Sequence, residues 1–323
     1  MKKTIALILT TALAVTMFLS CTESKKQITI GLSVDQLFES RVATNDGVKA
    51  EAEKHGIKVI EVVADGDPQL QNSQVQSLIT QQVDALLVCA VDQNTIDHAL
   101  RKADKAGIPI VAYDRDLPDS KAVNVFVGPD SHFDGFECGK YVAEQLEDES
   151  GEILILELLG ALNDQNGIDR SKGFNDALKV LPNAKIIQMP TDWSSDKALA
   201  AVQNAFQANP EIRAIFAATD TQVPSIETVL TDMGKLKKIG EDGHVIVVGV
   251  NGSYDGYISV AKGTADGITV MDCHATGETA VQLALKLIKG EAVDENTVIP
   301  GKFYTTENIE ANKSTIWGAP KEQ

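Results

Sequence analysis

Residues 105–115, KAGIPIVAYDR, decide the fold class of this 323-residue chain. Gly107 follows a helical stretch, and Pro109 lies just beyond its end. The run that follows is short, apolar and rich in β-branched residues, and it stops at Asp114 and Arg115. Such a continuous run is typical of a parallel strand that is covered on both faces. The stretch therefore predicts one helix–strand unit of an open α/β sheet.

The same alternation runs along most of the chain and starts again near residue 130. Strands are expected over residues 28–34, 57–63, 85–91, 108–113 and 123–127, then over 152–158, 184–189, 212–218, 245–250 and 267–271. Helices are expected over 41–55, 70–81, 94–106 and 133–145, then over 170–180, 195–208, 224–233, 254–262 and 277–288. Ten units in two halves predict an α/β fold of two similar doubly wound parallel-sheet lobes. An eight-fold barrel is the competing topology, but the pattern holds too many units for it.

The amino terminus predicts export. Residues 1–20 have a basic start and an apolar middle that is too short for a lasting membrane span, as in a secretory signal peptide. The junction Leu19-Ser20-Cys21 resembles a bacterial lipobox, which implies cleavage before Cys21 and a lipid on its thiol, with residues 21–27 as a tether. The alternative is ordinary cleavage nearby, with Cys21 a bystander. Both interpretations place the mature chain outside the cytoplasm.

Composition excludes several classes of function. The chain has 29 basic and 46 acidic residues, a net charge of −17, and such an acidic protein repels nucleic acid and anionic lipid. Cys89, Cys138 and Cys273 have no spacing typical of metal or redox sites, so they are interpreted as structural thiols, with one disulfide left open. The five histidines share no metal-ligand spacing, and no nucleotide-binding glycine motif follows the first strand. We expect no metal and no cofactor.

Polar side chains gather where the predicted strands end, and ligands of open parallel sheets bind beyond these ends. The candidate binding residues are Asp35, Phe38, Arg41, Asp114 and Arg115 in the first half, and Asn166, Trp193, Asp220, Asn251 and Asp272 in the second. This set lacks a nucleophile–base pair. It suits a polyol, because each hydroxyl group both donates to a carboxylate and accepts from an arginine or amide. Trp193 is the best candidate to pack on the C–H face of a sugar ring.

Five segments carry a resemblance to a known family: residues 28–32 (ITIGL), 105–115 (KAGIPIVAYDR), 168–174 (IDRSKGF), 214–220 (AIFAATD) and 247–252 (VVGVNG). From residue 28 to about residue 310, the chain resembles the ribose-, xylose- and galactofuranose-type sugar-binding proteins of ABC transporters. The resemblance implies a type I periplasmic binding protein fold with a three-segment hinge. The chain would cross near 128–130, 271–272 and 300–302. The lobes would then comprise residues 28–128 plus 272–299 and 129–271 plus 300–323.

The resemblance also implies roles for single residues. Asp114 and Arg115 would bind sugar hydroxyls, Arg41 would act from the first helix, and Trp193 would stack on the ring. Asp220 occupies the family's Asn-Asp position, and Asn251 stands where an aspartate is usual. Asp164, Gln165 and Asn166 compete for one ligand position, of which Asn166 is preferred, and Arg170 could reach the cleft. Thr219, Met271-Asp272 and the absence of paired phenylalanines near 38–41 depart from the pattern and argue against ribose.

The favoured function is capture of a monosaccharide and its delivery to an ABC permease, by a monomer tethered through Cys21. The alternative is a ligand-sensing subunit for a sensor kinase or chemoreceptor. A sugar-acting enzyme is less favoured, because the aspartates have arginine and amide neighbours suited to holding neutral hydroxyls rather than an opposed catalytic pair. A LacI-type regulator would carry a DNA-binding helix pair where residues 1–20 read as a signal peptide.

Overall fold

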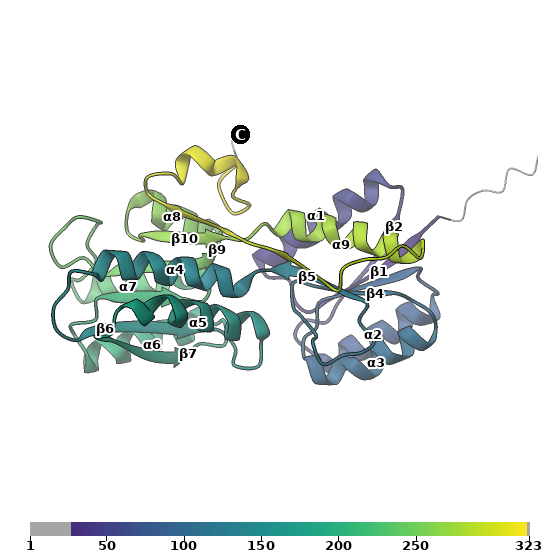
Figure 1. Cartoon of the computed structure of the whole chain (residues 1–323), viewed down its shortest axis with the longest axis horizontal. Coiled ribbons are helices and arrows are strands. Elements are labelled where there is room, and N and C mark those ends of the chain that lie inside the picture. Colours follow the sequence, from purple (N-terminus) through teal and green to yellow (C-terminus); the bar gives the residue numbers. More distant parts are fainter. Residues whose placement is uncertain (1–26, 322–323) are drawn as a thin grey trace, which may run out of the picture.

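The alternation of strands and helices divides into two lobes in the computed structural model, which describes residues 27–321 (Figure 1). The predicted signal peptide and Cys21 lie outside the described residues. Each lobe has one six-stranded sheet. The two sheets confirm the predicted fold class of two similar α/β lobes.

The first lobe is built on the sheet β11-β5-β4-β3-β1-β2, in which every strand pair is parallel. Its elements are β1 (Thr29–Val34), α1 (Glu39–Lys54), β2 (Lys58–Val63), α2 (Pro68–Thr80), β3 (Ala85–Val88), α3 (Gln93–Lys105), β4 (Ile110–Tyr113), β5 (Val125–Pro129), α9 (Cys273–Ile288) and β11 (Asn296–Ile299). Helices cover both faces: Leu87 packs in a cluster with α1 and α9, whereas Leu86 and Val88 pack in the cluster with α2 and α3. Burial on both faces explains why these strands are continuously apolar.

The second lobe is built on the sheet β12-β10-β9-β8-β6-β7. Its elements are α4 (Ser131–Leu146), β6 (Ile153–Leu159), α5 (Gln165–Ala177), β7 (Ala184–Pro190), α6 (Ser195–Ala208), β8 (Ala214–Ala217), α7 (Val223–Asp232), β9 (Ile246–Asn251), α8 (Tyr254–Lys262), β10 (Gly267–Val270) and β12 (Lys302–Thr305). Short 3-10 helices span Leu178–Val180, Asp220–Gln222 and Glu310–Thr315. β12 pairs antiparallel with β10, so this sheet is mostly rather than wholly parallel.

The chain passes between the sheets three times (Figure 1). It leaves β5 for α4, returns from β10 to α9, and passes from β11 in the first sheet directly to β12 in the second. α4 packs on β9 and β10, whereas α9 packs on α1 and β3. Each short passage therefore joins one lobe to the other.

Three local features differ from or extend the sequence expectations. The sequence pattern did not predict β11 and β12, whose side chains are half exposed and mixed in polarity. α5 begins at Gln165, five residues before the expected start at 170, because Asp164 caps it by accepting from the Asn166 amide. Cys89, Cys138 and Cys273 are free and buried, as expected of structural thiols.

Within residues 27–321, no helix is both long and apolar enough to cross a membrane.

Candidate ligand-binding site

A cavity lies between the lobes, and the ends of strands from both sheets contribute to it. It holds about 620 Å³ of empty space, part of which is open solvent. The first lobe contributes Phe38, Glu39, Ser40, Arg41, Asp114 and Arg115, and the second contributes Asp164, Asn166, Arg170, Trp193, Thr219, Thr221, Asn251, Met271 and Trp317.

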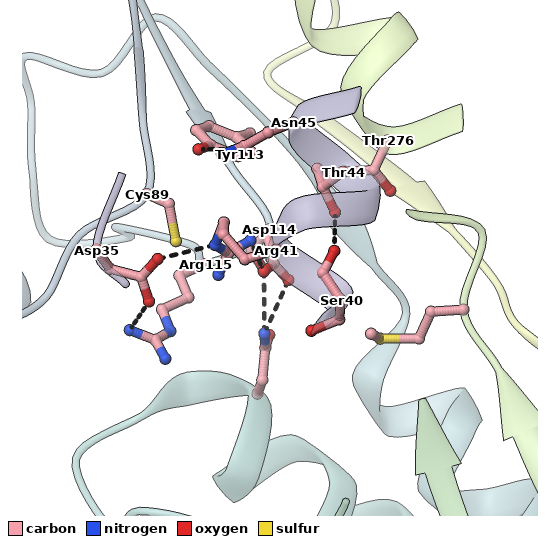
Figure 2. Close-up of polar contacts among 12 residues, drawn as sticks. Asp35, Ser40, Arg41, Thr44, Asn45, Cys89, Tyr113, Asp114, Arg115 and Thr276 are labelled. Carbon is pink, nitrogen blue, oxygen red and sulfur yellow. Dashed lines mark hydrogen bonds and ion pairs between the residues drawn. The ribbon is translucent and has the colours of Figure 1, made fainter. Parts of the chain in front are cut away.

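Charges of alternating sign run along one wall of this cavity (Figure 2). Arg41 pairs with Asp114 through Nη1, and its Nε lies 2.8 Å from Oδ1 of Asp35. Arg115 lies 2.9 Å from the other oxygen of Asp35 and 3.0 Å from Oδ2 of Asp164. Asp35 thus joins the two guanidinium groups, and this series of ion pairs ends at Asp164 on the opposite lobe. Each charged group has a fixed orientation before any ligand arrives.

Asp35 and Arg41 stay ionised in this wall at neutral pH. Burial alone would raise the pKa of Asp35, but Arg41 and Arg115 together hold that pKa below its ordinary value. Burial opposes the charge on Arg41, whereas Asp114 and Asp35 raise the pKa of its guanidinium well above the ordinary value. A ligand therefore meets fixed donors and acceptors.

Two polar contacts connect the lobes directly. Nδ2 of Asn166 donates to the main-chain oxygen of Asp114 at 3.1 Å and to its Oδ1 at 3.3 Å. Arg115 and Asp164 form the second contact. The structure therefore brings together residues that the sequence separates by about fifty positions, in a conformation in which the lobes touch.

Trp193 lies where strand β7 meets α6, on strained backbone. Asp192 and Trp193 both have positive φ, 49° and 64°, as does Asp114 with 63°. Non-glycine residues seldom adopt this conformation, and it concentrates at functional sites. The indole fits because position 160 is glycine: a Cβ there would lie 2.2 Å from a ring carbon. Nε1 of Trp193 donates to Asp164 at 3.2 Å.

Among residues 27–321, Arg170 is the guanidinium of this cavity that has no ion-pair partner. Its side chain is 3% exposed; Nη1 donates to the main-chain oxygen of Ala218 at 2.8 Å and Nη2 to Sδ of Met271 at 3.0 Å. Nε has no hydrogen-bond partner within the described part of the chain. Its carbon Cζ lies 5.7 Å from the centre of the Trp193 ring. A buried donor without a partner is costly, so this group is suited to an oxygen of a bound ligand.

Seven of the ten candidate residues line the cavity, namely Phe38, Arg41, Asp114, Arg115, Asn166, Trp193 and Asn251. Asp35 does not line this cavity but pairs with two of its arginines. It lines a second cavity, which shares Arg115, Asp164 and Trp193 with the first. Asn251 donates from Nδ2 to Thr219 at 2.7 Å. Asp164, an alternative to Asn166 for the same ligand position, lines the cavity as well.

The structure corrects the interpretation of Asp220 and Asp272. Asp220 is fully buried and does not line the cavity; its Oδ2 accepts from the amides of Gly252 at 2.7 Å and Ser253 at 3.0 Å. It therefore shapes the loop after β9. Asp272 is exposed and caps α9, with Oδ1 accepting from the Ala275 amide at 3.0 Å. The carboxylate is used by a helix end and is not directed to the cleft.

Sequence reasoning missed several lining residues. Trp317 comes from the tail after β12, where no strand end marks it, and its Nε1 donates to the main-chain oxygen of Asn251 at 2.9 Å. Ser40 and Thr221 lie beside predicted residues, but a hydroxyl side chain alone carries no positional signal. Within residues 27–321, no group of three or more histidine, cysteine or acidic side chains could hold a metal ion.

A family model, curated relatives and solved structures all indicate the same family for this chain. The family described as "Periplasmic binding protein domain" matches residues 32–292. The ribose import binding protein of Bacillus subtilis (strain 168) is 29% identical over 283 residues, covering 87% of this chain and 88% of the relative. A solute-binding protein of an ABC transporter from Mycobacterium smegmatis, solved with bound glycerol, has 30% identity and a TM-score of 0.81, covering 91% of this chain and 100% of that one. Another from Bacillus halodurans C-125, with bound myo-inositol, has 26% identity and the same TM-score of 0.81, covering 90% and 98%.

Proposed function

Because the chain belongs to the periplasmic binding protein domain family, we propose that it captures one small neutral sugar or polyol between its lobes and delivers it to an ABC permease. The charge balance of the cavity carries this proposal. Three arginines line it, as do three acids: Arg41, Arg115 and Arg170, with Glu39, Asp114 and Asp164. Equal numbers of fixed charges favour a neutral ligand that both donates and accepts hydrogen bonds, as hydroxyl groups do.

The chemistry of the relatives' ligands supports a polyol. The named ligands are ribose, glycerol and myo-inositol, all of which are neutral and rich in hydroxyl groups. Trp193 would cover the C–H face of a ring, while Asp114, Arg115 and Asn166 would bind its hydroxyls. Arg170 would donate to a further ligand oxygen through its unpartnered Nε. The relatives are binding proteins, so no bond of the ligand is broken.

The protein acts outside the cytoplasm, where its family acts. We propose that a lipid on Cys21 anchors it to a membrane and that the mature chain is a monomer. The junction Leu19-Ser20-Cys21 and the polar tether that follows support this proposal. A tether would keep the binding protein close to its permease.

Closure of the lobes would trap the ligand. We propose lobes of residues 28–128 plus 272–299 and 129–271 plus 300–323, which fit the positions where the chain passes between the sheets. Short connections of this kind act as hinges, since a few residues absorb the rotation. Small-angle scattering should then show compaction at saturating ligand, and an unchanged radius of gyration would argue against a large closure.

A thermal-shift screen tests the proposed function. The panel should hold ribose and other pentoses, hexoses, furanoses, inositols and sugar alcohols, with sugar phosphates as the charged control. A ligand at 100 times its dissociation constant stabilises a protein by about 2.7 kcal/mol, which raises the melting temperature by several degrees. Calorimetry on the best compound then gives the affinity. Stabilisation by the phosphorylated compounds alone, or by no compound, would contradict the proposal.

A further inference from the structure

One buried carboxyl group, that of Asp134, lies against the third passage between the lobes. This residue lies in the first turn of α4, just after the passage from β5, and its side chain is 0% exposed. Its main-chain oxygen accepts from the Thr269 hydroxyl at 3.0 Å, in β10 just before the second passage. Its Oδ1 accepts from the amide of Gly301 at 3.0 Å, between β11 and β12. Asp134 thus contacts the third hinge segment through its side chain, the strand before the second through its main-chain oxygen, and Asp130 in the first through its amide.

The contact with Gly301 leaves no room for another side chain. A Cβ at position 301 would lie 2.5 Å from Oδ1 of Asp134, so a larger residue would push the carboxyl group away. Oδ2 is buried and has no hydrogen-bond partner among residues 27–321. A buried carboxyl oxygen without a donor is costly, so the position of this group calls for an explanation beyond packing.

The carboxyl group of Asp134 is also affected by the charge of a residue that lines the cavity. Burial raises the pKa of its carboxyl group to about 7, and the nearby Arg170 guanidinium opposes that rise. The other titratable groups near Asp134 are Asp130 and Cys138, both on its own helix. Arg170 lines the cavity and forms no ion pair among the described residues, so its guanidinium is the cavity group that the charge of Asp134 would attract.

We infer that Asp134 is a positioning residue for ligand binding, which couples the hinge at Gly301 to the guanidinium of Arg170. The ionised carboxylate makes a charge-assisted hydrogen bond to the Gly301 amide and attracts Arg170, which holds both in the geometry of the closed lobes. Protonation weakens both interactions. Ligand affinity therefore falls as the pH falls through about 7. This inference rests on the proposed capture of a ligand by closing lobes.

The variant Asp134→Asn tests the charge with little change of shape. An amide oxygen still accepts from Gly301, but it carries no charge. We expect the variant to bind the best panel compound about 5- to 20-fold more weakly than the wild type at pH 8.5, the difference between a charged and a neutral hydrogen bond. Below pH 6 the two affinities should converge. Calorimetry from pH 5.5 to 8.5 gives both profiles.

Glu157→Gln is the matched control. Glu157 is also fully buried in the second lobe, has one unpartnered oxygen, and has a pKa raised by burial, but its partners are Asn175 and Gln188, away from the hinge. This variant should keep the wild-type affinity and its pH profile. Wild-type affinity in Asp134→Asn at pH 8.5, or an unchanged pH profile in it, would overturn the inference.

A measurement without ligand separates the inference from the proposed function. Amide hydrogen exchange at Gly301, corrected for the intrinsic effect of pH, should be faster in Asp134→Ala than in the wild type, whereas Glu157→Gln should leave it unchanged. If no panel compound binds the wild type, the proposed function fails and this exchange still decides whether Asp134 holds the hinge. Equal protection of Gly301 in Asp134→Ala and wild type would show that it does not.

Discussion

Arg115 and Asp164 belong to different lobes, yet Nη2 of the guanidinium lies 3.0 Å from Oδ2 of the carboxylate. The same carboxyl group caps α5 and accepts from Nε1 of Trp193. One acid therefore joins the first lobe, the aromatic residue of the second lobe and the start of a helix. The pair is positioned to act as a latch across the cleft.

Loss of this latch should favour the open form. Asp164→Asn keeps an oxygen that can cap α5 but removes the charge that attracts Arg115. Scattering on the ligand-free variant should give a larger radius of gyration than the wild type, and affinity should fall about fivefold to tenfold. Asp169→Asn is the control, since its carboxylate contacts Gln165 on the same helix and does not line the cavity. An unchanged radius in Asp164→Asn would show that the ion pair does not hold the lobes together.

Asp114 and Arg115 should each carry a large share of the affinity. Both line the cavity, and hydrogen bonds of charged groups contribute about 1.5–3 kcal/mol each. Asp114→Ala or Arg115→Ala should therefore weaken binding roughly 10- to 150-fold. Calorimetric titration measures this, and near-wild-type affinity in both variants would refute the site. Asp114→Ala should also lower stability, because it leaves the buried Arg41 with Asp35 as its one remaining ion-pair partner in the described structure.

Ligand binding should change tryptophan fluorescence. The chain has two tryptophans, Trp193 and Trp317, and both line the cavity. If Trp193 covers the ring of the ligand, Trp317→Phe should keep most of the spectral change and Trp193→Phe should lose it. Trp193→Ala should bind more weakly than Trp193→Phe, since it loses the aromatic surface as well as the Nε1 donor. A change that disappears only in Trp317→Phe would place the ligand against the tail instead.

Stability and affinity should respond to pH in opposite directions at Asp134. Its pKa is about 7 in the fold, above the ordinary 3.8, so the folded state binds this proton more tightly than the unfolded state. The protonated carboxyl group of Asp134 therefore contributes to the free energy of unfolding at low pH, and this contribution is lost as the pH rises from about 4 to about 7. At pH 8, Asp134→Asn should be more stable than the wild type although it binds more weakly. Denaturant titrations of both proteins at pH 5 and pH 8 isolate the effect.

Asp220 provides a second test of the link between a raised pKa and the pH dependence of stability. Burial raises its pKa to about 6, although the amides of Gly252 and Ser253 oppose the rise. Its contribution to stability should thus decline as the pH rises from about 4 to about 6. Asp220→Asn should reduce that slope in denaturant titrations. Unlike Asp134→Asn, this variant should alter ligand affinity only by disturbing the loop of Asn251. We therefore expect it to be more stable than the wild type above pH 6, while the pH profile of ligand binding keeps its wild-type shape.

Lipidation can be tested directly at Cys21. Cys21→Ser should release the protein from the membrane fraction or leave the precursor uncleaved, because serine has no thiol to accept the lipid. Metabolic labelling with a fatty acid, followed by fractionation, measures both outcomes. Labelling that persists in the variant would place the lipid elsewhere or exclude it.

Sequence by itself determined five of the six strands in each sheet, and the edge at which the predicted ligand site forms. Leu86, Leu87 and Val88 are apolar in succession because parallel strands bury both faces, and this pattern is local. Asp114 and Arg115 were found because polar residues after such strands lie at the ligand-binding edge.

Only the tertiary structure decided what each polar group does there. Asp35, Asp220 and Asp272 all follow predicted strands, yet one orients arginines, one holds a loop and one caps a helix. A carboxylate accepts equally well from a ligand, a guanidinium or a backbone amide, so its role depends on which donor the fold brings within 3 Å. For Asp134 that donor is Gly301, 167 residues away in the chain, and no local pattern records a contact between such distant residues.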